Sequence, residues 1–425
     1  MRLKAALQNK VAKTLFSPAR RDAKRRKAEK TRRAKGLPHK VEYFHDASDP
    51  YSHLMAQLLP DFARRYDVDL HVHITPSPPD WAAPDRARLD AYARKDAARL
   101  AKKMGLAYSD PGQQPKPSDV GIAQTQLLAA IEAGVFHEKA ADIGERLWRR
   151  ELEADGSGPI DDAVLAAAAN RRDTLGHYLG GTVFYAGEWY WGPDRLHFIE
   201  TRLQEFGAGD ARTPLFAPPA IETSQPVEPK ASAPELHWYL SFRSPYTGIV
   251  RDRVKQLADA YGAELKIRYV LPMVMRGMQV PRKKGFYIMR DTVREAERLG
   301  VAFGNSVDPV GEPVERGYAI LHEAIRRGLG YAFAQSFLAG VWADGLDAGT
   351  DKGLKTMTER AGLPWSEMKP LLGTDDWRDE AEANQEEMFT YGLWGVPSFR
   401  VGEIATWGQD RLWVIEDALK AASAA

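Results

Sequence analysis

The fold of the second half of the chain is decided by Leu236-His237-Trp238-Tyr239-Leu240 and by Phe242-Arg243-Ser244-Pro245-Tyr246, which follows it. The first stretch is short, rich in aromatic and aliphatic residues and free of glycine and proline, so it predicts a strand. Ser244 and Pro245 then predict a helix start, because serine is a preferred N-cap and proline fits the first helical position. The sequence therefore predicts a strand that leads directly into a helix running from Ser244 to Tyr261.

The patterns further along the chain complete one α/β domain. Alternating and β-branched residues predict a second strand, and a long stretch with few breakers predicts a helical block. A glycine-valine-proline turn then leads into a predicted hairpin and a last helix. The expected elements are a strand at Glu264–Val270, helices within Tyr287–Thr390, a turn at Gly395-Val396-Pro397, hairpin strands at Ser398–Val401 and Glu403–Thr406, and a helix from Gln409. This order is typical of a thioredoxin-like fold with an all-helical insertion.

The first half of the chain looks like another copy of the same plan. Val41-Glu42-Tyr43-Phe44-His45 precedes Asp49-Pro50-Tyr51-Ser52, and Asp49 lies 195 positions before Ser244. The same offset relates Tyr92 to Tyr287, Asp96 to Asp291, Arg99 to Arg294 and Gly105 to Gly300, while Trp191-Gly192-Pro193-Asp194-Arg195-Leu196 matches Trp407-Gly408-Gln409-Asp410-Arg411-Leu412 at an offset of 216. Such an internal repeat predicts a tandem duplication. The expected fold class is therefore α/β, with two tandem thioredoxin-like domains, each carrying an all-helical insertion.

Composition divides the chain into four parts. Six prolines fall between positions 207 and 234, where no periodic apolar pattern is present, so this segment predicts an extended linker. We expect a basic N-terminal arm at 1–37, a first domain at 38–206, the Pro/Ala-rich linker at 207–234 and a second domain at 235–425.

The basic arm carries most of the charge asymmetry of the chain. Residues 1–40 hold 15 lysines and arginines against two acids, a net +13, which leaves −12 for the remainder of a chain whose total is +1. Such an arm predicts a solvated, partly helical tail without a dedicated partner. The alternative is weak polyanion contact through residues 1–35, with nucleic acid, anionic lipid or the acidic body of the same protein.

The count of zero cysteines excludes more chemistry than any other feature of the composition. It removes disulfides, thiolate metal sites, cysteine nucleophiles and thiol–disulfide exchange by the chain itself. No apolar run reaches the length of about 18 residues that a spanning helix needs, so no membrane span is expected. A cytoplasmic protein is the expectation. The pair His71 and His73 has no convincing further ligands nearby, so no metal site is expected.

Four motifs of the second domain together resemble one known family. Phe242-Arg243-Ser244-Pro245-Tyr246 resembles the serine-containing entrance motif of kappa-class glutathione transferases and 2-hydroxychromene-2-carboxylate isomerases, which are DsbA-like proteins of the thioredoxin fold. Val280-Pro281-Arg282-Lys283-Lys284-Gly285-Phe286-Tyr287 resembles the basic segment of that family. Trp394-Gly395-Val396-Pro397-Ser398-Phe399 resembles its cis-proline loop, and Trp407-Gly408-Gln409-Asp410-Arg411-Leu412 its closing motif.

This resemblance implies a site that uses glutathione as cofactor. Ser244 would be the catalytic residue, stabilising the glutathione thiolate by a hydrogen bond at the positive end of its helix. Val396 and Pro397 would present backbone groups to the tripeptide. Gln409 and Asp410 would bind its γ-glutamyl carboxylate and ammonium. Lys284 would hold its glycine carboxylate, with Arg282 and Lys283 as alternatives.

The implied activity is that of a glutathione-dependent isomerase or a kappa-type transferase acting on a small-molecule enone or other electrophile. The alternative is a catalytically silent thioredoxin-fold binding or scaffold protein whose basic arm contacts polyanions. In the first domain, Asp49 replaces Ser244, Leu89 replaces Lys284 and Thr182 replaces Pro397, so this copy is expected to be degenerate. The sequence leaves two arrangements open, an internal pseudo-dimer of the two copies and a homodimer of chains.

Overall fold

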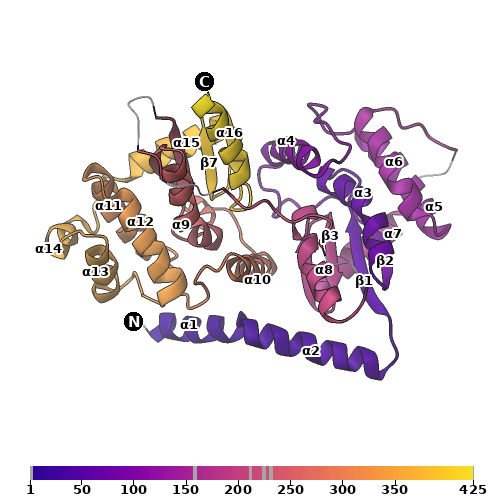
Figure 1. Cartoon of the computed structure of the whole chain (residues 1–425), viewed down its shortest axis with the longest axis horizontal. Helices are drawn as coiled ribbons and strands as arrows, with labels where there is room; N and C mark the ends of the chain where they lie inside the picture. The colour runs from indigo at the N-terminus through magenta and orange to yellow at the C-terminus, as the bar shows by residue number, and fades with distance from the viewer. Residues whose placement is uncertain (1–2, 157–159, 210–212, 223–225, 229–232, 425) are drawn as a thin grey trace. The chain divides into compact units, whose positions relative to one another are not determined.

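The computed structural model describes residues 3–156, 160–209, 213–222, 226–228 and 233–424. Its contacts divide the chain into two compact units. One unit comprises Met1–Arg21, Pro219–Val280 and Ile288–Ala425, and the other comprises Asp22–Pro218 and Pro281–Tyr287. Each unit contains one four-stranded sheet covered by helices (Figure 1). The described residues of the 207–234 segment form no helix or strand.

The second-domain sheet has the strand order β6-β5-β7-β8. Its strands are β5 (Glu235–Leu240), β6 (Glu264–Tyr269), β7 (Ser398–Val401) and β8 (Ile404–Trp407). β5 is parallel to β6, with α9 (Pro245–Ala260) as the crossover between them, and is antiparallel to β7. The hairpin β7–β8 closes the other edge. The predicted element order is confirmed.

Helices form the remainder of the second domain. They are α10 (Arg282–Arg298), α11 (Glu312–Arg326), α12 (Gly330–Ala339), α13 (Asp351–Arg360), α14 (Trp365–Met368), α15 (Arg378–Thr390) and α16 (Leu412–Ala424), with short turns at Met273–Arg276, Gly340–Asp344 and Lys369–Leu371. The core joins the sheet to this helical block: Trp238 of β5 and Phe242 are fully buried, as are Tyr318 of α11 and Phe337 of α12. Burial of these aromatic rings stabilises the packing of the insertion on the sheet.

The first-domain sheet repeats this topology in the order β2-β1-β3-β4. Its elements are β1 (His39–His45), α3 (Pro50–Arg65), β2 (Val68–Ile74), α4 (Arg86–Met104), α5 (Pro117–Glu132), α6 (Phe136–Arg149), α7 (Asp162–Leu175), β3 (Thr182–Tyr185), β4 (Glu188–Trp191), the turn Pro193–Arg195 and α8 (Leu196–Glu205). The likeness extends to side chains, because the Tyr51 hydroxyl donates to Asp96 and the Tyr246 hydroxyl donates to Asp291, each over 2.8 Å.

The last helix begins later than the sequence pattern predicted. We expected it from Gln409, but α16 starts at Leu412, and Gln409 and Asp410 lie in a turn closed by the Arg411 N–H on the Gly408 carbonyl. The buried Gln409 side chain fixes this turn, because its Nε2 donates to Glu295 Oε2 over 2.8 Å and Arg253 donates to its backbone carbonyl. The hairpin strand β8 is likewise shifted by one residue, to Ile404–Trp407.

The basic arm forms two helices, α1 (Leu3–Leu15) and α2 (Pro18–Ala34). Asn9 is buried and donates to Asn305 Oδ1 (2.9 Å) and to the Ser306 carbonyl (3.0 Å). Arg25 makes two hydrogen bonds to the Glu188 carboxylate, at 2.6 and 2.7 Å. For Arg25, the acidic body of the same protein is therefore a partner that the structure shows. Within the part of the chain that the structure describes, no helix is both long and apolar enough to cross a membrane.

Candidate active site around Ser244

Ser244 lies where β5 has ended and α9 begins, and it caps that helix. Its Oγ accepts the Thr247 N–H (3.2 Å), and Pro245 occupies the first helical position. Its hydroxyl also donates to the backbone carbonyl of Val396 (3.2 Å). The side chain is partly exposed. The N-cap predicted from sequence is confirmed, and a polar group is thereby placed at the positive end of a 16-residue helix.

The Val396 loop is the second component of this site. The Val396–Pro397 peptide bond is cis, and the Pro397 carbonyl accepts the Gly408 N–H over 2.9 Å. Gly395 lies against the indole of Trp407 so closely that an added Cβ would be 2.3 Å from the ring. The Ser398 hydroxyl donates to the Gly395 carbonyl (2.7 Å). These contacts fix the loop that faces Ser244.

Gln409 and Asp410 come just after β8, the second strand of the hairpin that this loop precedes. Gln409 Oε1 accepts from Arg253 at 3.0 Å, so together with Glu295 its side chain is used within the fold. Burial, and then the neighbouring Arg298, lower the pKa of Arg253 to about 10. Asp410 Oδ2 lies 3.5 Å from Arg411 Nη1. A ligand at this turn would thus meet the Gln409 backbone rather than its amide.

Arg243 is a neighbour of Ser244 whose partner the sequence did not reveal. Its guanidinium makes two hydrogen bonds of 3.0 Å to the carboxylate of Asp308, a residue 65 positions away. The loop that carries Asp308 is itself tied to the start of the turn Gly340–Asp344, because the Val307 N–H donates to the Val341 carbonyl. The charge beside Ser244 is therefore paired and held in one orientation.

Ser244, Val396, Pro397, Gln409 and Asp410 belong to one unit, whereas Lys284 groups with the other. Burial lowers the pKa of Lys284. Its neighbour Lys283 makes an ion pair with Asp173 and lies 5.3 Å from the centre of the Trp81 ring. The structure thus brings Ser244 and Val396 into contact and places Gln409 and Asp410 near them in the same domain. It assigns Lys284 to the segment that packs with the first domain.

The first domain has an aspartate where the second has Ser244. The Asp49 carboxylate caps α3, accepting the Tyr51 N–H (3.2 Å), the Ser52 N–H (3.1 Å) and the Ser52 hydroxyl (2.9 Å). An added Cβ on Gly181 would be 2.9 Å from Asp49 Oδ2. Burial, and then the like charge of Asp46, raise the pKa of Asp49 to about 7.

The prediction that Thr182 stands in the place of Pro397 is wrong. Thr182 begins β3 and pairs with Phe44, while Ser398 begins β7 and pairs with Tyr239, so Thr182 corresponds to Ser398. Gly181 corresponds to Pro397 instead, because its carbonyl accepts the Gly192 N–H over 2.9 Å, as Pro397 accepts that of Gly408. The error is a register shift of one residue: Thr182 lies 215 positions before Pro397, whereas the strand pairing gives the offset of 216 that also relates the closing motifs.

The paired histidines of the first domain have ordinary partners. His73 Nε2 lies 3.2 Å from Glu42 Oε2, and its ring stacks on Phe44. His71 lies 2.7 Å from Asp69. Among the residues with described positions, no group of three or more histidine, cysteine or acidic side chains could hold a metal ion.

Replacement of Asp49 by asparagine is expected to stabilise the first domain in a pH-dependent way. The Asp49 carboxyl, whose pKa is about 7 in the folded state against an ordinary value of 3.8, binds a proton more readily when the chain is folded. Its contribution to stability is fully present below about pH 4, falls as the pH rises to about 7, and is absent above that. An asparagine at this position would remain a good N-cap without the charge.

The measurement is the free energy of urea unfolding of the wild type and of Asp49→Asn at about pH 5 and about pH 8. At the higher pH this free energy should be larger for Asp49→Asn, by an amount of the order of 1 kcal/mol or more. The gain should be smaller at the lower pH. An equal difference at both pH values would show that the Asp49 carboxyl does not titrate in this window.

Known proteins match the second half of the chain. Residues 235–420 match the family model of the DSBA-like thioredoxin domain. A 2-hydroxychromene-2-carboxylate isomerase from Pseudomonas sp. (strain C18) is 23% identical over 194 residues, covering 43% of this chain and 89% of the relative. The enzyme of the same name from Pseudomonas putida is 22% identical over 194 residues, covering 43% and 93%.

A solved structure, that of selenomethionine 2-hydroxychromene-2-carboxylate isomerase, aligns with 44% of this chain and 94% of its own, at 21% identity and a TM-score of 0.38. The family match agrees with the strand order and with the serine-capped helix described above. Residues 235–420 therefore form a DsbA-like thioredoxin domain.

Proposed function

We propose that the second domain is a glutathione-dependent isomerase or transferase that acts on a small-molecule enone or other electrophile. The observation that carries this proposal is the Ser244 hydroxyl, which lies at the N-terminus of α9 and 3.2 Å from the Val396 carbonyl. The names of the two isomerase relatives support the reaction class. The donor set fits a thiolate: a rotatable hydroxyl, a helix N-terminus and no cysteine to compete for the sulfur.

When bound, glutathione supplies a thiol whose ionised form is a strong nucleophile. The role of Ser244 is to hold that ion: its O–H, which donates to Val396 in the structure, turns to donate to the sulfur. The positive end of α9 stabilises the same charge. The backbone of Val396 pairs with the tripeptide, in a loop that the Gly395–Trp407 contact keeps in place.

The remaining residues bind the two ends of the tripeptide. We assign the γ-glutamyl carboxylate to the backbone N–H groups of Gln409 and Asp410, and the ammonium to the Asp410 carboxylate. The candidates for the glycine carboxylate are Lys284 and its basic neighbours in Pro281–Tyr287, a segment that groups with the other unit. Lys283 is a weaker candidate because Asp173 already neutralises it, which leaves Arg282 as the alternative. The matching topology of the two sheets supports a tandem duplication in which the first copy, with Asp49 and Gly181, has lost this site.

The test is calorimetric titration of the full chain with glutathione, beside Ser244→Ala and beside S-methylglutathione as ligand. The wild type should bind glutathione, and S-methylglutathione should bind less tightly because its sulfur cannot ionise. Ser244→Ala should lose this preference for the free thiol. Absence of glutathione binding by the wild type would overturn the proposal.

The alternative function, a silent binding protein, is favoured by one observation. Lys24, Arg26, Lys27 and Lys30 of α2 are exposed, and none forms an ion pair with any residue that the structure describes. These side chains leave a cationic face open to a polyanion. If this face binds nucleic acid, the affinity of the full chain for an oligonucleotide will fall steeply with salt and will be lost when the four residues are changed to glutamine.

A further inference from the structure

A pocket of about 420 Å³ opens at the end of the second-domain sheet that is remote from Ser244. It lies where β5 starts, where β7 ends and beside the last turns of α16, whereas Ser244 follows the other end of β5. Its lining consists of Pro234, Glu235, His237, Arg400, Val401, Gly402, Ile404, Ala418, Ala421 and Ala422. This volume is in the range of sites for small organic molecules.

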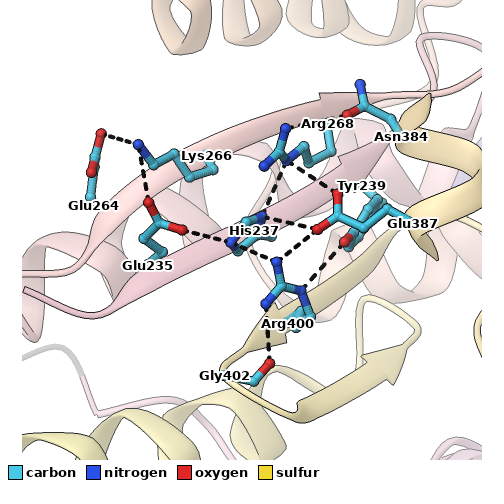
Figure 2. A network of polar contacts seen from close by, with 10 residues as sticks. All are labelled: Glu235, His237, Tyr239, Glu264, Lys266, Arg268, Asn384, Glu387, Arg400 and Gly402. Carbon is cyan, nitrogen blue, oxygen red and sulfur yellow. Dashed lines mark hydrogen bonds and ion pairs between the residues drawn. The ribbon is translucent and has the colours of Figure 1, made fainter. Parts of the chain in front are cut away.

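One end of the pocket is polar and is built by Arg400. As Figure 2 shows, this side chain lies between Glu387, His237 and the carbonyl of Gly402. The nitrogen Nη2 lies 2.8 Å from both Glu387 Oε1 and His237 Nε2, and Nη1 donates to Gly402 over 3.1 Å. The Arg400 side chain is only 12% exposed, so its position is fixed by these contacts.

Too many hydrogen-bond donors converge on His237. We assign the ring proton to Nε2, because Arg268 Nε lies 3.1 Å from Nδ1, which then accepts. In that form Nε2–H donates to Glu235 Oε2 over 3.0 Å (Figure 2). In the opposite tautomer, the Nδ1–H of His237 would face the Nε–H of Arg268, and the lone pair on Nε2 would face the Glu235 carboxylate. Nε2 is therefore a donor.

The N–H of Arg400 that faces His237 consequently has no acceptor there. One Nη2 hydrogen is used by Glu387, and the second is directed at the ring nitrogen that already carries a proton. Protonation of His237 would not relieve this conflict, since both ring nitrogens would then be donors. A buried donor that faces another donor is costly, so an anion beside the Arg400 guanidinium in the pocket would stabilise it.

The remainder of the pocket is apolar. Ala418, Ala421 and Ala422 are spaced three and four residues apart and share one face of α16. Val401 and Ile404 come from the β7–β8 hairpin, and Ile404 exposes 42% of its surface. The small alanine side chains leave room, and the walls suit a hydrocarbon body.

We propose that this pocket is a second ligand site, separate from Ser244, for a carboxylate that carries an apolar chain or ring. The carboxylate would accept from Arg400, and the apolar body would lie between α16 and Ile404. The two carboxylates near the site are each paired with a cation, so they do not exclude an anionic ligand. Lys266 lies 3.3 Å from the Glu235 carboxylate, and Glu387 lies between Arg400 and Arg268.

The probe is octanoate, titrated calorimetrically into the full chain, with octanol as the uncharged ligand of equal length. Octanoate should bind at one saturable site, and octanol should bind at least about tenfold more weakly, because it cannot replace the charge-assisted hydrogen bond. Ala421→Trp fills the pocket from α16 and should reduce octanoate affinity about tenfold or more. The control, Ala166→Trp on the exposed face of α7, should leave it unchanged.

The two sites are distinguished by glutathione. Ala421→Trp should leave glutathione binding as in the wild type, and an unchanged midpoint of urea unfolding shows that the variant folds. The proposal is overturned if octanoate does not saturate, if octanol binds as well as octanoate, or if Ala421→Trp binds octanoate like the wild type. None of these results depends on whether the Ser244 site binds glutathione.

Discussion

Ser244→Asp is expected to weaken glutathione binding by about 10²-fold or more at a pH where the bound thiol would be ionised. The reason is electrostatic: a carboxylate at this position would repel the thiolate that a hydroxyl stabilises, and two like charges about 4 Å apart cost several kcal/mol in a partly buried site. The helix itself should remain capped, because Asp49 shows that an aspartate caps the equivalent helix of the first domain. The measurement is the calorimetric dissociation constant of glutathione.

Ser244→Thr is the matched control, because it keeps both the hydroxyl and a good N-cap. Its affinity for glutathione should remain within about tenfold of the wild type. If Ser244→Asp binds glutathione as tightly as Ser244→Thr does, Ser244 does not contact the sulfur, and the proposed role of this residue is wrong.

Phe242→Ala is expected to destabilise the second domain by about 3–5 kcal/mol, a large share of the stability of an ordinary domain. The ring is fully buried, is stacked on Phe337 at 3.9 Å between centroids and packs at 5.1 Å from Tyr318. Its removal would leave a cavity between β5 and the helical insertion. The readout is hydrogen exchange of α11 and α12, which should become much faster.

The matched control is Phe286→Ala, the same chemical change at a ring that is 40% exposed. It should cost less than about 1 kcal/mol and leave the exchange of α11 and α12 unaltered. Equal acceleration by both substitutions would contradict the view that Phe242 joins the sheet to the insertion.

The sequence was sufficient for those features that depend on local patterns. The strand at Leu236–Leu240 and the helix after Ser244 follow from residue type and capping, and the internal repeat predicted that the two sheets would share one order. The candidate residues Ser244 and Val396 do come into contact.

Other features depend on contacts between distant residues and could not be predicted. The Arg243–Asp308 pair joins residues 65 positions apart. The buried contacts of Gln409 with Arg253 and Glu295 set the start of α16 at Leu412. By contrast, the correspondence of Gly181 to Pro397 could have been predicted, because the offset of 216 between the closing motifs already relates these two positions, and the strand pairing shows the same match.

The central claim, that the Ser244 site activates a glutathione thiol, is tested most directly by the pKa of that thiol in the complex. Ultraviolet absorbance of the thiolate, followed as a function of pH with saturating glutathione, measures it. For the wild type we predict a thiol pKa clearly below the ordinary value of about 8.5, and for Ser244→Ala a return towards that value. An unshifted thiol pKa in the wild-type complex, or the same shift in Ser244→Ala, would contradict the claim.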